Sequence, residues 1–282
     1  MTVGVVGAGL MGAEIALVFA LGGHEVLLHD RSQEALTAAL VRLAGVIDRG
    51  VARQAYPAER ARSALDRIRP AADLAAMADC AMVTEAVYEA LEVKTEVLRA
   101  LDAVVRPDCV IASNTSTLPI STLAACMPQA RRAHFLGTHY FSPASRMALV
   151  EVIPGFATDE AITNATIAIL EAVGKQTVRI RDVAGFAVNR MLHAMLIEAV
   201  KLVEEGVATP ADLDIACRLG LGHPIGPFAM MDIVTADLCL QVQQILHDAY
   251  GERFRPPALL KQRVAAGYGG GRGRRGWLDA GG

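Results

Sequence analysis

Directly after Met1 stands the stretch TVGVVGAGLMG (residues 2–12), and this stretch decides the fold. Residues 2–6 are apolar and mostly β-branched, which predicts a buried strand. A glycine pattern follows at residues 7–12, and residues 13–22 have the apolar density of a helix. A second apolar run, residues 25–29, ends in Asp30. The order strand, glycine turn, helix, strand and acid is typical of a dinucleotide-binding unit.

Each glycine of this turn has its own physical role. Gly7 permits the tight turn out of the strand, Gly9 lets a pyrophosphate approach the backbone, and Gly12 lets the helix pack closely. The N–H groups at the start of a helix bind anions, and the helix dipole favours negative charge there. We therefore expect the pyrophosphate of a dinucleotide to lie against Gly7, Gly9, Leu10, Met11 and Gly12.

Asp30 follows Gly12 by eighteen residues, the spacing at which an acid accepts hydrogen bonds from the adenosine ribose. A carboxylate would also repel a 2′-phosphate, so Asp30 favours NAD over NADP. Arg31 weakens this preference, because an arginine at this turn can hold such a phosphate. A glycine turn in another kind of α/β domain is the alternative interpretation.

The composition excludes several classes of protein. The 282 residues are 53% hydrophobic and 20% charged, which is typical of a globular chain. A net charge of −3 gives no reason to expect nucleic acid as a partner. The five cysteines are widely spaced and form no CxxC pair, so we expect reduced thiols in a cytoplasmic protein and no metal site. Since no stretch is long and apolar enough to span a bilayer, we expect no membrane association.

Ser32 is placed to cap a helix that runs through the forties. On that helix Arg42, Arg49 and Arg53 would lie within about 20° of one line. Such a stripe could contact a polyphosphate. A solvated helix face is the other interpretation, and the spacing alone favours it.

Polar residues follow two further predicted strands, residues 81–84 and 109–112. In a doubly wound sheet, the loops at the carboxyl ends of the strands line the ligand crevice. Glu89 and Lys94 are therefore candidate cofactor contacts, although an ordinary surface pair is equally compatible with the sequence. The segment Ser113-Asn114-Thr115-Ser116-Thr117 could cap the helix expected after Pro119, or it could donate hydrogen bonds to a substrate oxygen.

Glu151 interrupts the otherwise apolar run of residues 147–153, which predicts a strand. An edge strand with one face in water would explain it, but Leu149 and Ile153 share its face and are apolar. A carboxylate on an apolar face needs a partner, and His139 is the nearest titratable candidate. A histidine paired with a partly buried acid is a better candidate for catalysis than a lone histidine.

A helix over 158–173 and a strand over 175–180 complete the α/β part. Beyond Asp182 the pattern predicts only helices, over 185–205, 210–219, 226–250 (broken) and 257–266. The fold class is therefore α/β, a Rossmann-type doubly wound sheet in a nucleotide-binding domain (1–182) followed by an all-helical C-terminal domain (183–282). We expect the glycine-rich tail, 267–282, to be poorly ordered, with Trp277 as its one anchor.

Seven stretches together resemble the short-chain L-3-hydroxyacyl-CoA dehydrogenases, a family that includes bacterial 3-hydroxybutyryl-CoA dehydrogenases. They span almost the whole chain: GAGLMG (7–12), EAVYE (85–89), SNTS (113–116), HYFSP (139–143), LVEV (149–152), GFAVNR (185–190) and HPIGP (223–227). The chain departs from the family pattern at Ser142, where many members have asparagine, at Ala184, where proline is common, and in the tail around Trp277.

The resemblance implies the reversible oxidation of an L-3-hydroxyacyl-CoA to the 3-ketoacyl-CoA with NAD. It implies His139 as the catalytic base paired with Glu151, and Ser116 and Asn189 as partners of the substrate oxygen. It also implies NAD contacts from Asp30, Glu89, Lys94 and Asn114, and a basic residue near the phosphates of CoA, the place of Arg53. The helical domain would form a homodimer interface.

Two rival interpretations remain. Sugar-acid dehydrogenases of the L-gulonate type share the fold and the histidine, but the stretch Tyr140-Phe141-Ser142-Pro143 looks more like the acyl-CoA branch. The other rival is a non-catalytic NAD-binding protein, against which the retention of both His139 and Glu151 argues.

Overall fold

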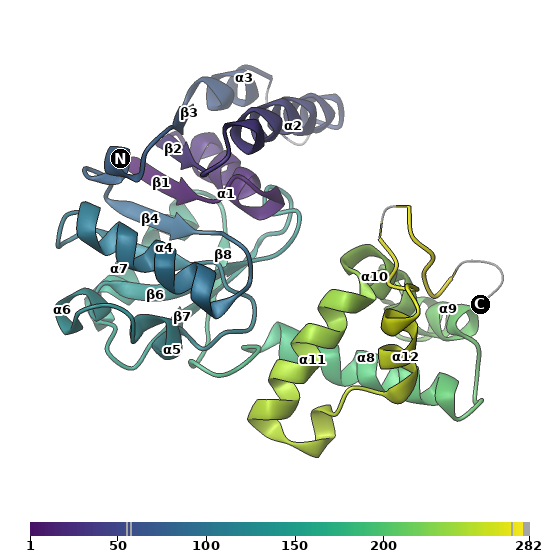
Figure 1. Cartoon of the computed structure of the whole chain (residues 1–282). Coiled ribbons are helices and arrows are strands. Elements are labelled where there is room, and N and C mark those ends of the chain that lie inside the picture. The colour runs from purple at the N-terminus through teal and green to yellow at the C-terminus, as the bar shows by residue number, and fades with distance from the viewer. Residues whose placement is uncertain (55, 57, 272, 279–282) are drawn as a thin grey trace. The chain divides into compact units, whose positions relative to one another are not determined.

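The computed structural model describes residues 1–54, 56, 58–271 and 273–278. The chain divides into two compact units, Met1–Val183 and Ala184–Gly282. The first unit contains all the strands of Figure 1, and the second is built from helices.

An eight-stranded sheet forms the centre of the first unit, in the order β3-β2-β1-β4-β5-β6-β7-β8. Neighbouring strands are parallel except β6 and β7, which are antiparallel. The order reverses direction on the two sides of β1, as in doubly wound sheets, so the predicted fold class is confirmed. The strands are β1 (Thr2–Val6), β2 (Glu25–His29), β3 (Ile68–Ala71), β4 (Met82–Glu85), β5 (Val110–Ser113), β6 (Phe135–Tyr140), β7 (Leu149–Pro154) and β8 (Gln176–Arg179).

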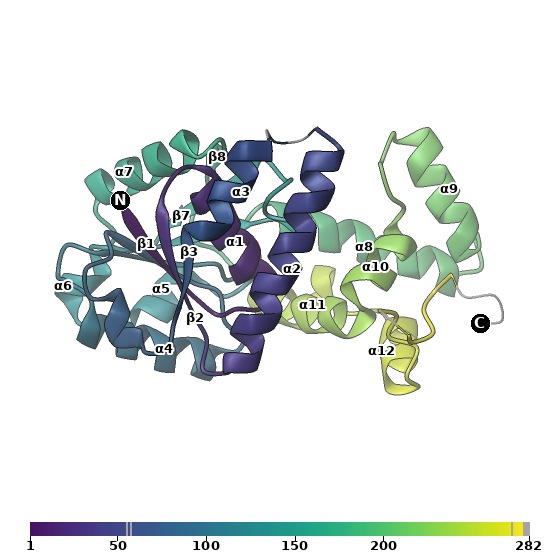
Figure 2. The same cartoon turned by 90° about the horizontal axis from the view of Figure 1, so that it is seen from above.

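Helices cover both faces of the sheet (Figures 1 and 2). Helices α1 (Leu10–Leu21) and α7 (Glu160–Ala172) lie on one face, and both contribute side chains to one large core cluster with β1 and β2. Helices α4 (Leu91–Val104) and α5 (Ile120–Ala124) lie on the other face. The remaining helices of this unit are α2 (Gln33–Ala52), α3 (Ala58–Asp66), the 3-10 helix η1 (Leu74–Met77) and α6 (Gln129–Arg132).

Helix α2 begins where the sequence predicts. The Ser32 hydroxyl accepts a hydrogen bond from the Ala35 N–H at 3.1 Å, which satisfies one of the unpaired donors at the helix start. The predicted N-cap is therefore confirmed.

Two strands of the sheet were not recognised from the sequence. β3 has only four residues, two of them exposed, and it lies at the edge of the sheet, where Pro70 can be tolerated. β6 is buried along its whole length, but Gly137, Thr138 and His139 interrupt its apolar pattern. A Cβ at position 137 would lie 2.6 Å from Ile120 Cδ1, so glycine there permits close packing with α5.

The second unit consists of helices packed around a core that includes Leu196, Phe228 and Trp277. The broken helical stretch expected over 226–250 is confirmed: it divides at Thr235, which has φ +84° and caps the following helix through its hydroxyl. The elements are α8 (Val188–Glu204), α9 (Pro210–Gly220), α10 (Pro227–Val234), α11 (Ala236–Tyr250), the 3-10 helix η2 (Glu252–Phe254) and α12 (Ala258–Ala265). Within the described residues, no helix is long and apolar enough to cross a bilayer.

The glycine-rich tail is packed over the part that the structure describes, so the expectation of poor order is wrong for 267–271 and 273–278; the rest of the tail lies outside the described residues. Trp277 is only 5% exposed, and its ring lies 5.1 Å from that of Phe228. The backbone N–H of Trp277 donates to Asp232 Oδ1 at 2.8 Å. Since a Cβ at Gly276 would lie 2.3 Å from the same carboxylate, glycine is what allows this close approach. The expectation that Trp277 is the anchor is confirmed.

Candidate active site

The glycine turn leaves an open surface at the start of α1. Gly7 has φ +106°, and a Cβ there would lie 2.5 Å from the Ala86 carbonyl oxygen. A Cβ at Gly12 would lie 1.8 Å from the Gly7 carbonyl oxygen, so Gly12 is required by the turn itself. At Gly9, in contrast, a Cβ would meet no described atom within 4 Å, and this residue precedes α1 without a side-chain cap. A ligand anion can therefore approach the first N–H groups of α1 from this side.

Asp30 lies beside this turn at the end of β2. Its carboxylate accepts hydrogen bonds from the Ala8 N–H at 2.8 Å and from the Ser32 N–H at 3.0 Å. Asp30 therefore ties the turn to the start of α2 and leaves part of its surface exposed.

Arg42 does not belong to a solvated helix face. Its guanidinium donates to the carbonyl oxygens of Ala8 and Gly9, both at 3.1 Å, and so supports the glycine turn from α2. Arg49 and Arg53 are exposed, and Arg53 caps the carboxyl end of α2 with its backbone N–H. Arg53, the residue predicted to contact CoA, therefore lies on an exposed surface, and its contacts within the protein do not identify a ligand.

Glu85, Lys94 and Glu89 form a buried charged cluster at the end of β4. The Lys94 ammonium, 1% exposed, donates to Glu85 Oε1 at 2.8 Å and to the Val87 carbonyl at 3.2 Å, and it lies 3.2 Å from Glu89 Oε2. Since an ammonium has three donors, these contacts account for all of them. The interpretation of Glu89 and Lys94 as an ordinary surface pair is therefore wrong, because Lys94 is buried.

Glu89 organises the polar segment that follows β5. Its Oε1 accepts hydrogen bonds from the N–H groups of Ser116 and Thr117 at 2.8 and 3.1 Å, and from the Thr115 hydroxyl at 2.6 Å. Burial alone would raise the pKa of the Glu89 carboxyl, but the Lys94 charge and these hydrogen bonds outweigh burial and hold the pKa below its ordinary value. Glu89 is therefore ionised at neutral pH and fixes the backbone at Ser116.

Asn114 connects this segment to β6. Its side-chain oxygen accepts a hydrogen bond from the Tyr140 N–H at 3.0 Å, directly beside His139 in the chain. The helix after Pro119 is capped by Asp182, which accepts from the N–H groups of Ile120 and Ser121 at 2.6 and 2.7 Å. Capping of α5 is therefore not the role of the hydroxyl-rich segment.

His139 and Glu151 meet as the sequence predicts. They are directly opposite partners in the antiparallel pair of β6 and β7, and His139 Nδ1 lies 2.7 Å from Glu151 Oε2. Both are buried, with 4% and 1% of their surfaces exposed. The ring of Phe141 packs 4.6 Å from the imidazole. A histidine oriented by a buried carboxylate is the arrangement of a general base.

Most of the predicted site residues lie at or just after the carboxyl ends of neighbouring strands of the first unit. The register places Val6 beside His29 and Glu85, Glu85 beside Ser113, and Ser113 beside Gly137. The segments that follow these residues carry the glycine turn, Asp30, Glu89, Asn114, Ser116 and His139. One edge of one sheet therefore brings them together.

Asn189 belongs to the second unit, near the start of α8. Its neighbour Arg190 stacks on the ring of Tyr250 at 3.9 Å, and the Tyr250 hydroxyl donates to the Ala184 carbonyl at 2.9 Å. These contacts hold the first turn of α8 against the end of α11.

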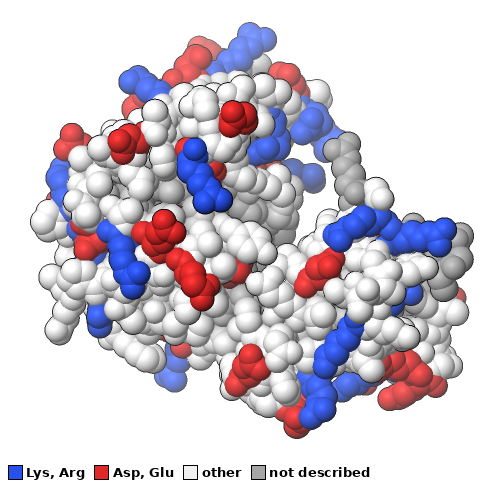
Figure 3. All heavy atoms as spheres, viewed as in Figure 1, with Lys and Arg blue, Asp and Glu red and all other residues white. Residues whose placement is uncertain are grey.

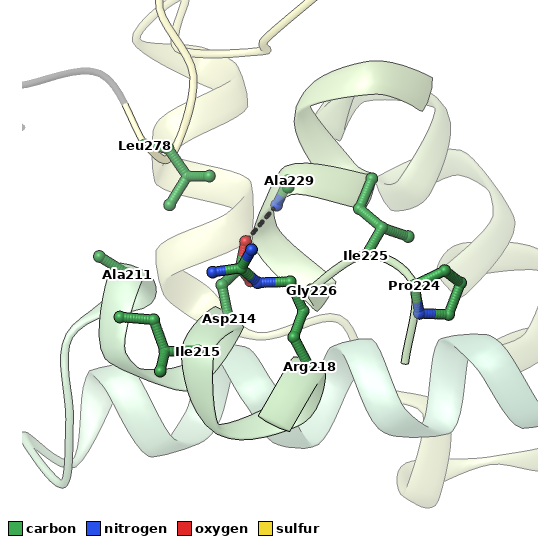
Figure 4. Close-up of a pocket in the computed structure, with 9 residues that line it drawn as sticks. All are labelled: Ala211, Asp214, Ile215, Arg218, Pro224, Ile225, Gly226, Ala229 and Leu278. Atoms are coloured by element: carbon green, nitrogen blue, oxygen red, sulfur yellow. Dashed lines mark hydrogen bonds between the residues drawn. The ribbon is translucent and has the colours of Figure 1, made fainter. Parts of the chain in front are cut away.

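The second unit also contains a cavity of about 470 Å³ between α9 and α10 (Figure 4). Asp214 points from α9 to the start of α10 and accepts from the N–H groups of Phe228 and Ala229, so its role there is to cap α10. Arg218 and the apolar Ile215 and Leu278 are among the other residues that line it. No predicted site residue lines this cavity.

The roles of two acids, the buried Glu85 and the partly buried Asp182, were missed from the sequence. Glu85 accepts hydrogen bonds from Lys94, the Val87 N–H and the Ser113 hydroxyl, and its only signal was an acid at the end of an apolar strand. Asp182 gave no signal, because its partners lie about sixty residues away in the chain.

Among the described residues, no group of three or more His, Cys, Asp or Glu side chains could hold a metal ion. Acidic and basic side chains are interspersed on the face seen in Figure 3.

Known proteins match this chain over both of its units. Residues 2–183 match the NAD-binding domain of 3-hydroxyacyl-CoA dehydrogenase, and residues 185–280 match its C-terminal domain. A 3-hydroxybutyryl-CoA dehydrogenase of Bradyrhizobium diazoefficiens is 38% identical over 98% of this chain and 94% of that protein. A 3-hydroxybutyryl-CoA dehydrogenase of Mycobacterium tuberculosis is also 38% identical, over 98% of this chain and 96% of the relative.

A solved structure agrees with these relatives. The crystal structure of (S)-3-hydroxybutyryl-CoA dehydrogenase from Ralstonia eutropha is 36% identical, covers 97% of each chain and superposes with a TM-score of 0.91. The resemblance inferred from the seven sequence stretches is therefore confirmed. The chain belongs to the 3-hydroxyacyl-CoA dehydrogenase family of NAD-dependent oxidoreductases.

Proposed function

We propose that this enzyme oxidises the 3-hydroxyl group of short-chain L-3-hydroxyacyl-CoA substrates to the ketone, and catalyses the reverse reduction, with NAD as the cofactor. The observation that carries the proposal is the buried pair of His139 and Glu151, 2.7 Å apart. The names of the relatives, which are 3-hydroxybutyryl-CoA dehydrogenases, support a short acyl chain.

His139 acts as the base. Because the Glu151 carboxylate holds Nδ1, this nitrogen carries the proton and Nε2 carries the lone pair that can accept the proton of the hydroxyl group. The carboxylate also stabilises the imidazolium that forms when Nε2 takes the proton. In the direction of reduction, the same imidazolium returns the proton to the substrate oxygen.

The residues present fit NAD. The open side of Gly9, the start of α1 and the carboxylate of Asp30 together offer a pyrophosphate site and an acceptor for ribose hydroxyls. When bound, NAD supplies the hydride acceptor of the reaction. Asp30, Glu89 and Asn114 are the proposed contacts of the ribose and nicotinamide parts, and Lys94 is proposed to support them. Lys94, with all three donors engaged, would contribute through Glu89.

Ser116 and Asn189 are the proposed partners of the substrate oxygen. The Ser116 N–H is fixed by Glu89, which supports a defined direction for its side chain. Arg53 is the proposed basic contact of the CoA phosphates, and its exposure on α2 is compatible with an ionic contact to a large ligand.

The proposed assembly is a homodimer through the helical unit. Large apolar side chains are exposed on and just after α9: Ile215 is 46%, Leu219 82% and Leu221 66% exposed. Exposed apolar groups close together on one element are typical of interaction surfaces. Fatty acid metabolism in the cytoplasm is the proposed setting, in keeping with five cysteines that are free thiols.

The test is steady-state oxidation of NADH with acetoacetyl-CoA, run beside free acetoacetate and beside NADPH. We expect turnover with the CoA ester and NADH only. Turnover with a sugar acid instead of the CoA ester would support the L-gulonate type of dehydrogenase. NADH binding without turnover of any of these substrates would support a non-catalytic NAD-binding protein.

A further inference from the structure

The loop of residues 141–148 joins β6 to β7, and these two strands carry His139 and Glu151. Because the two side chains are opposite partners across the strands, any shift of one strand against the other changes the distance between imidazole and carboxylate. The conformation of this loop therefore bears directly on the geometry of the proposed catalytic pair.

Lys175 binds the loop from the start of β8. Its ammonium donates to the carbonyl oxygens of Ala144 and Met147 at 2.5 and 2.9 Å, and the residue is only 8% exposed. Burial lowers the pKa of Lys175 below its ordinary value, and the charge of Glu14 opposes this effect. β8 in turn pairs with β7, with Glu151 beside Val178, so Lys175 belongs to the same part of the sheet as the loop that it holds.

Glu14 binds the same loop from α1. Its Oε2 accepts a hydrogen bond from the Ser145 N–H at 2.8 Å, and the residue is only 4% exposed. Glu14 is the one charged residue in α1, whose sequence is otherwise apolar apart from Gly12. It follows Gly12 by two residues, so the helix that begins at the glycine turn is tied directly to the loop beside His139.

Two buried opposite charges thus hold three backbone groups of one loop. Burying a charge is costly unless it is paired and hydrogen-bonded, and a core made only of apolar residues would avoid this cost. Neither residue lies at the carboxyl ends of the central strands, where the proposed cofactor and substrate contacts gather. Within the described part of the chain, the side-chain hydrogen bonds of both residues go to this loop.

We infer that Glu14 and Lys175 are positioning residues, which fix the catalytic hairpin of β6 and β7 relative to the dinucleotide-binding turn. They act through the backbone of Ala144, Ser145 and Met147 and touch neither substrate nor cofactor. The inference rests on the proposed function, because it takes His139 as the base that must be held in place. A displacement of about 1 Å at a reacting group can lower a rate by about 100-fold.

The test compares graded substitutions at both positions. Lys175→Met removes the donors, whereas Lys175→Arg retains a cation that can donate to two carbonyl oxygens. Glu14→Leu removes the acceptor of the Ser145 N–H, whereas Glu14→Gln retains an acceptor oxygen without the charge. Lys261→Met and Glu92→Gln, at exposed positions of α12 and α4, are the matched controls.

The kinetic readout separates a positioning role from a purely structural one. For Lys175→Met and Glu14→Leu we expect kcat with acetoacetyl-CoA to fall by about 10- to 100-fold, with the KM for NADH within about twofold of the original value. For Lys175→Arg and Glu14→Gln we expect recovery of kcat to within about threefold. The two control variants should retain the original kcat.

Hydrogen exchange gives a second readout that does not depend on activity. Amide exchange over 141–148 should become faster by about 10-fold or more in Lys175→Met and Glu14→Leu, with exchange of β1 unchanged. Folded variants whose kcat and loop exchange both equal those of the original chain would overturn the inference. An original chain that does not turn over acetoacetyl-CoA would instead contradict the proposed function, and the exchange of the loop would still test the structural part of the inference.

Discussion

His139 and Glu151 lie directly opposite each other across the single antiparallel strand pair of the described sheet, with Nδ1 and Oε2 2.7 Å apart. In an antiparallel pair, directly opposite residues have Cβ atoms about 4.5–5.5 Å apart on the same face, within reach of a side-chain hydrogen bond. The pair therefore depends on a local exception to the topology of the sheet. Its geometry is set by backbone hydrogen bonds, not by flexible side chains alone.

Removing the charge of Glu151 should reduce catalysis strongly. In Glu151→Gln we expect kcat with acetoacetyl-CoA and NADH to fall by at least about 100-fold, because the amide no longer stabilises the imidazolium. Steady-state kinetics measure this directly. Glu160→Gln, which removes a carboxylate from an exposed pair with Arg179, is the control and should leave kcat unchanged. An undiminished kcat in Glu151→Gln would contradict the role of the pair.

Asp30 should decide between the two nicotinamide cofactors. In Asp30→Ser we expect the KM for NADH to rise by about 10-fold, because one ribose acceptor is lost, and NADPH to become a usable cofactor beside Arg31. The ratio of kcat/KM for NADH and NADPH measures the change. Since Asp30 also accepts from the Ala8 and Ser32 N–H groups, the thermal stability of the variant must be measured as well. An unchanged ratio in a folded variant would show that selectivity lies elsewhere.

The buried pair of Lys94 and Glu85 should be strongly coupled. Lys94→Met leaves the Glu85 carboxylate buried without its cation, so we expect a loss of about 3–5 kcal/mol in the free energy of unfolding. The double variant Glu85→Gln with Lys94→Met should recover part of this loss, because the fully buried Glu85 position no longer carries a charge, whereas Glu89 still lacks its cation. Urea unfolding of the single and double variants measures the coupling. If the loss of stability in the double variant equals the sum of the losses in the two single variants, the pairing is contradicted.

Gln243 should be replaceable with a gain in stability. It lies fully buried on α11, and neither atom of its amide has a hydrogen-bond partner among the described residues. Gln243→Met keeps the length of the side chain and removes the buried polar group, so we expect stabilisation by about 1–2 kcal/mol. Urea unfolding compares it with Gln262→Met, an exposed control on α12 that should change little. A loss of stability would indicate that the amide has a partner, such as a buried water molecule.

His193 should make the helical unit sensitive to acid. Burial lowers the pKa of His193 from 6.5 to about 4, so the unfolded chain takes up a proton at a higher pH than the folded chain. The stability is fully present above about pH 6.5 and is lost as the pH falls towards about 4, by up to about 3 kcal/mol. Unfolding of His193→Gln, measured between pH 7 and pH 4.5, should show a smaller loss. His223→Gln, at a partly exposed position, is the control and should keep the original pH dependence.

Structural features could be predicted from the sequence where the local residue pattern and the chemistry of those residues indicate the same structure. The glycine turn, the helix cap at Ser32 and the break within the helical stretch 226–250 each depend on residues close together in the chain, and each is confirmed. The pairing of His139 with Glu151 could be predicted because a carboxylate in an apolar strand requires a partner nearby.

Contacts between distant segments could not be predicted. Glu14 and Ser145 are separated by 131 positions, and Asp182 caps a helix that begins 62 positions earlier. The strand β6 was missed because Gly137, Thr138 and His139 interrupt its apolar pattern, so this pattern is not that of a buried strand. The tail was judged by its glycine content, whereas the Asp232 carboxylate and the pocket for Trp277 determine its packing.

Trp277 gives this chain an internal spectroscopic reporter. It is the single tryptophan of the sequence, and it is buried beside Phe228 under the guanidinium of Arg263. Its fluorescence emission therefore reports on one location, where the carboxyl-terminal segment meets the helical core. Unfolding followed by this emission will register the second unit, whereas circular dichroism will register both, and a separation between the two curves would reveal that the units lose their structure independently.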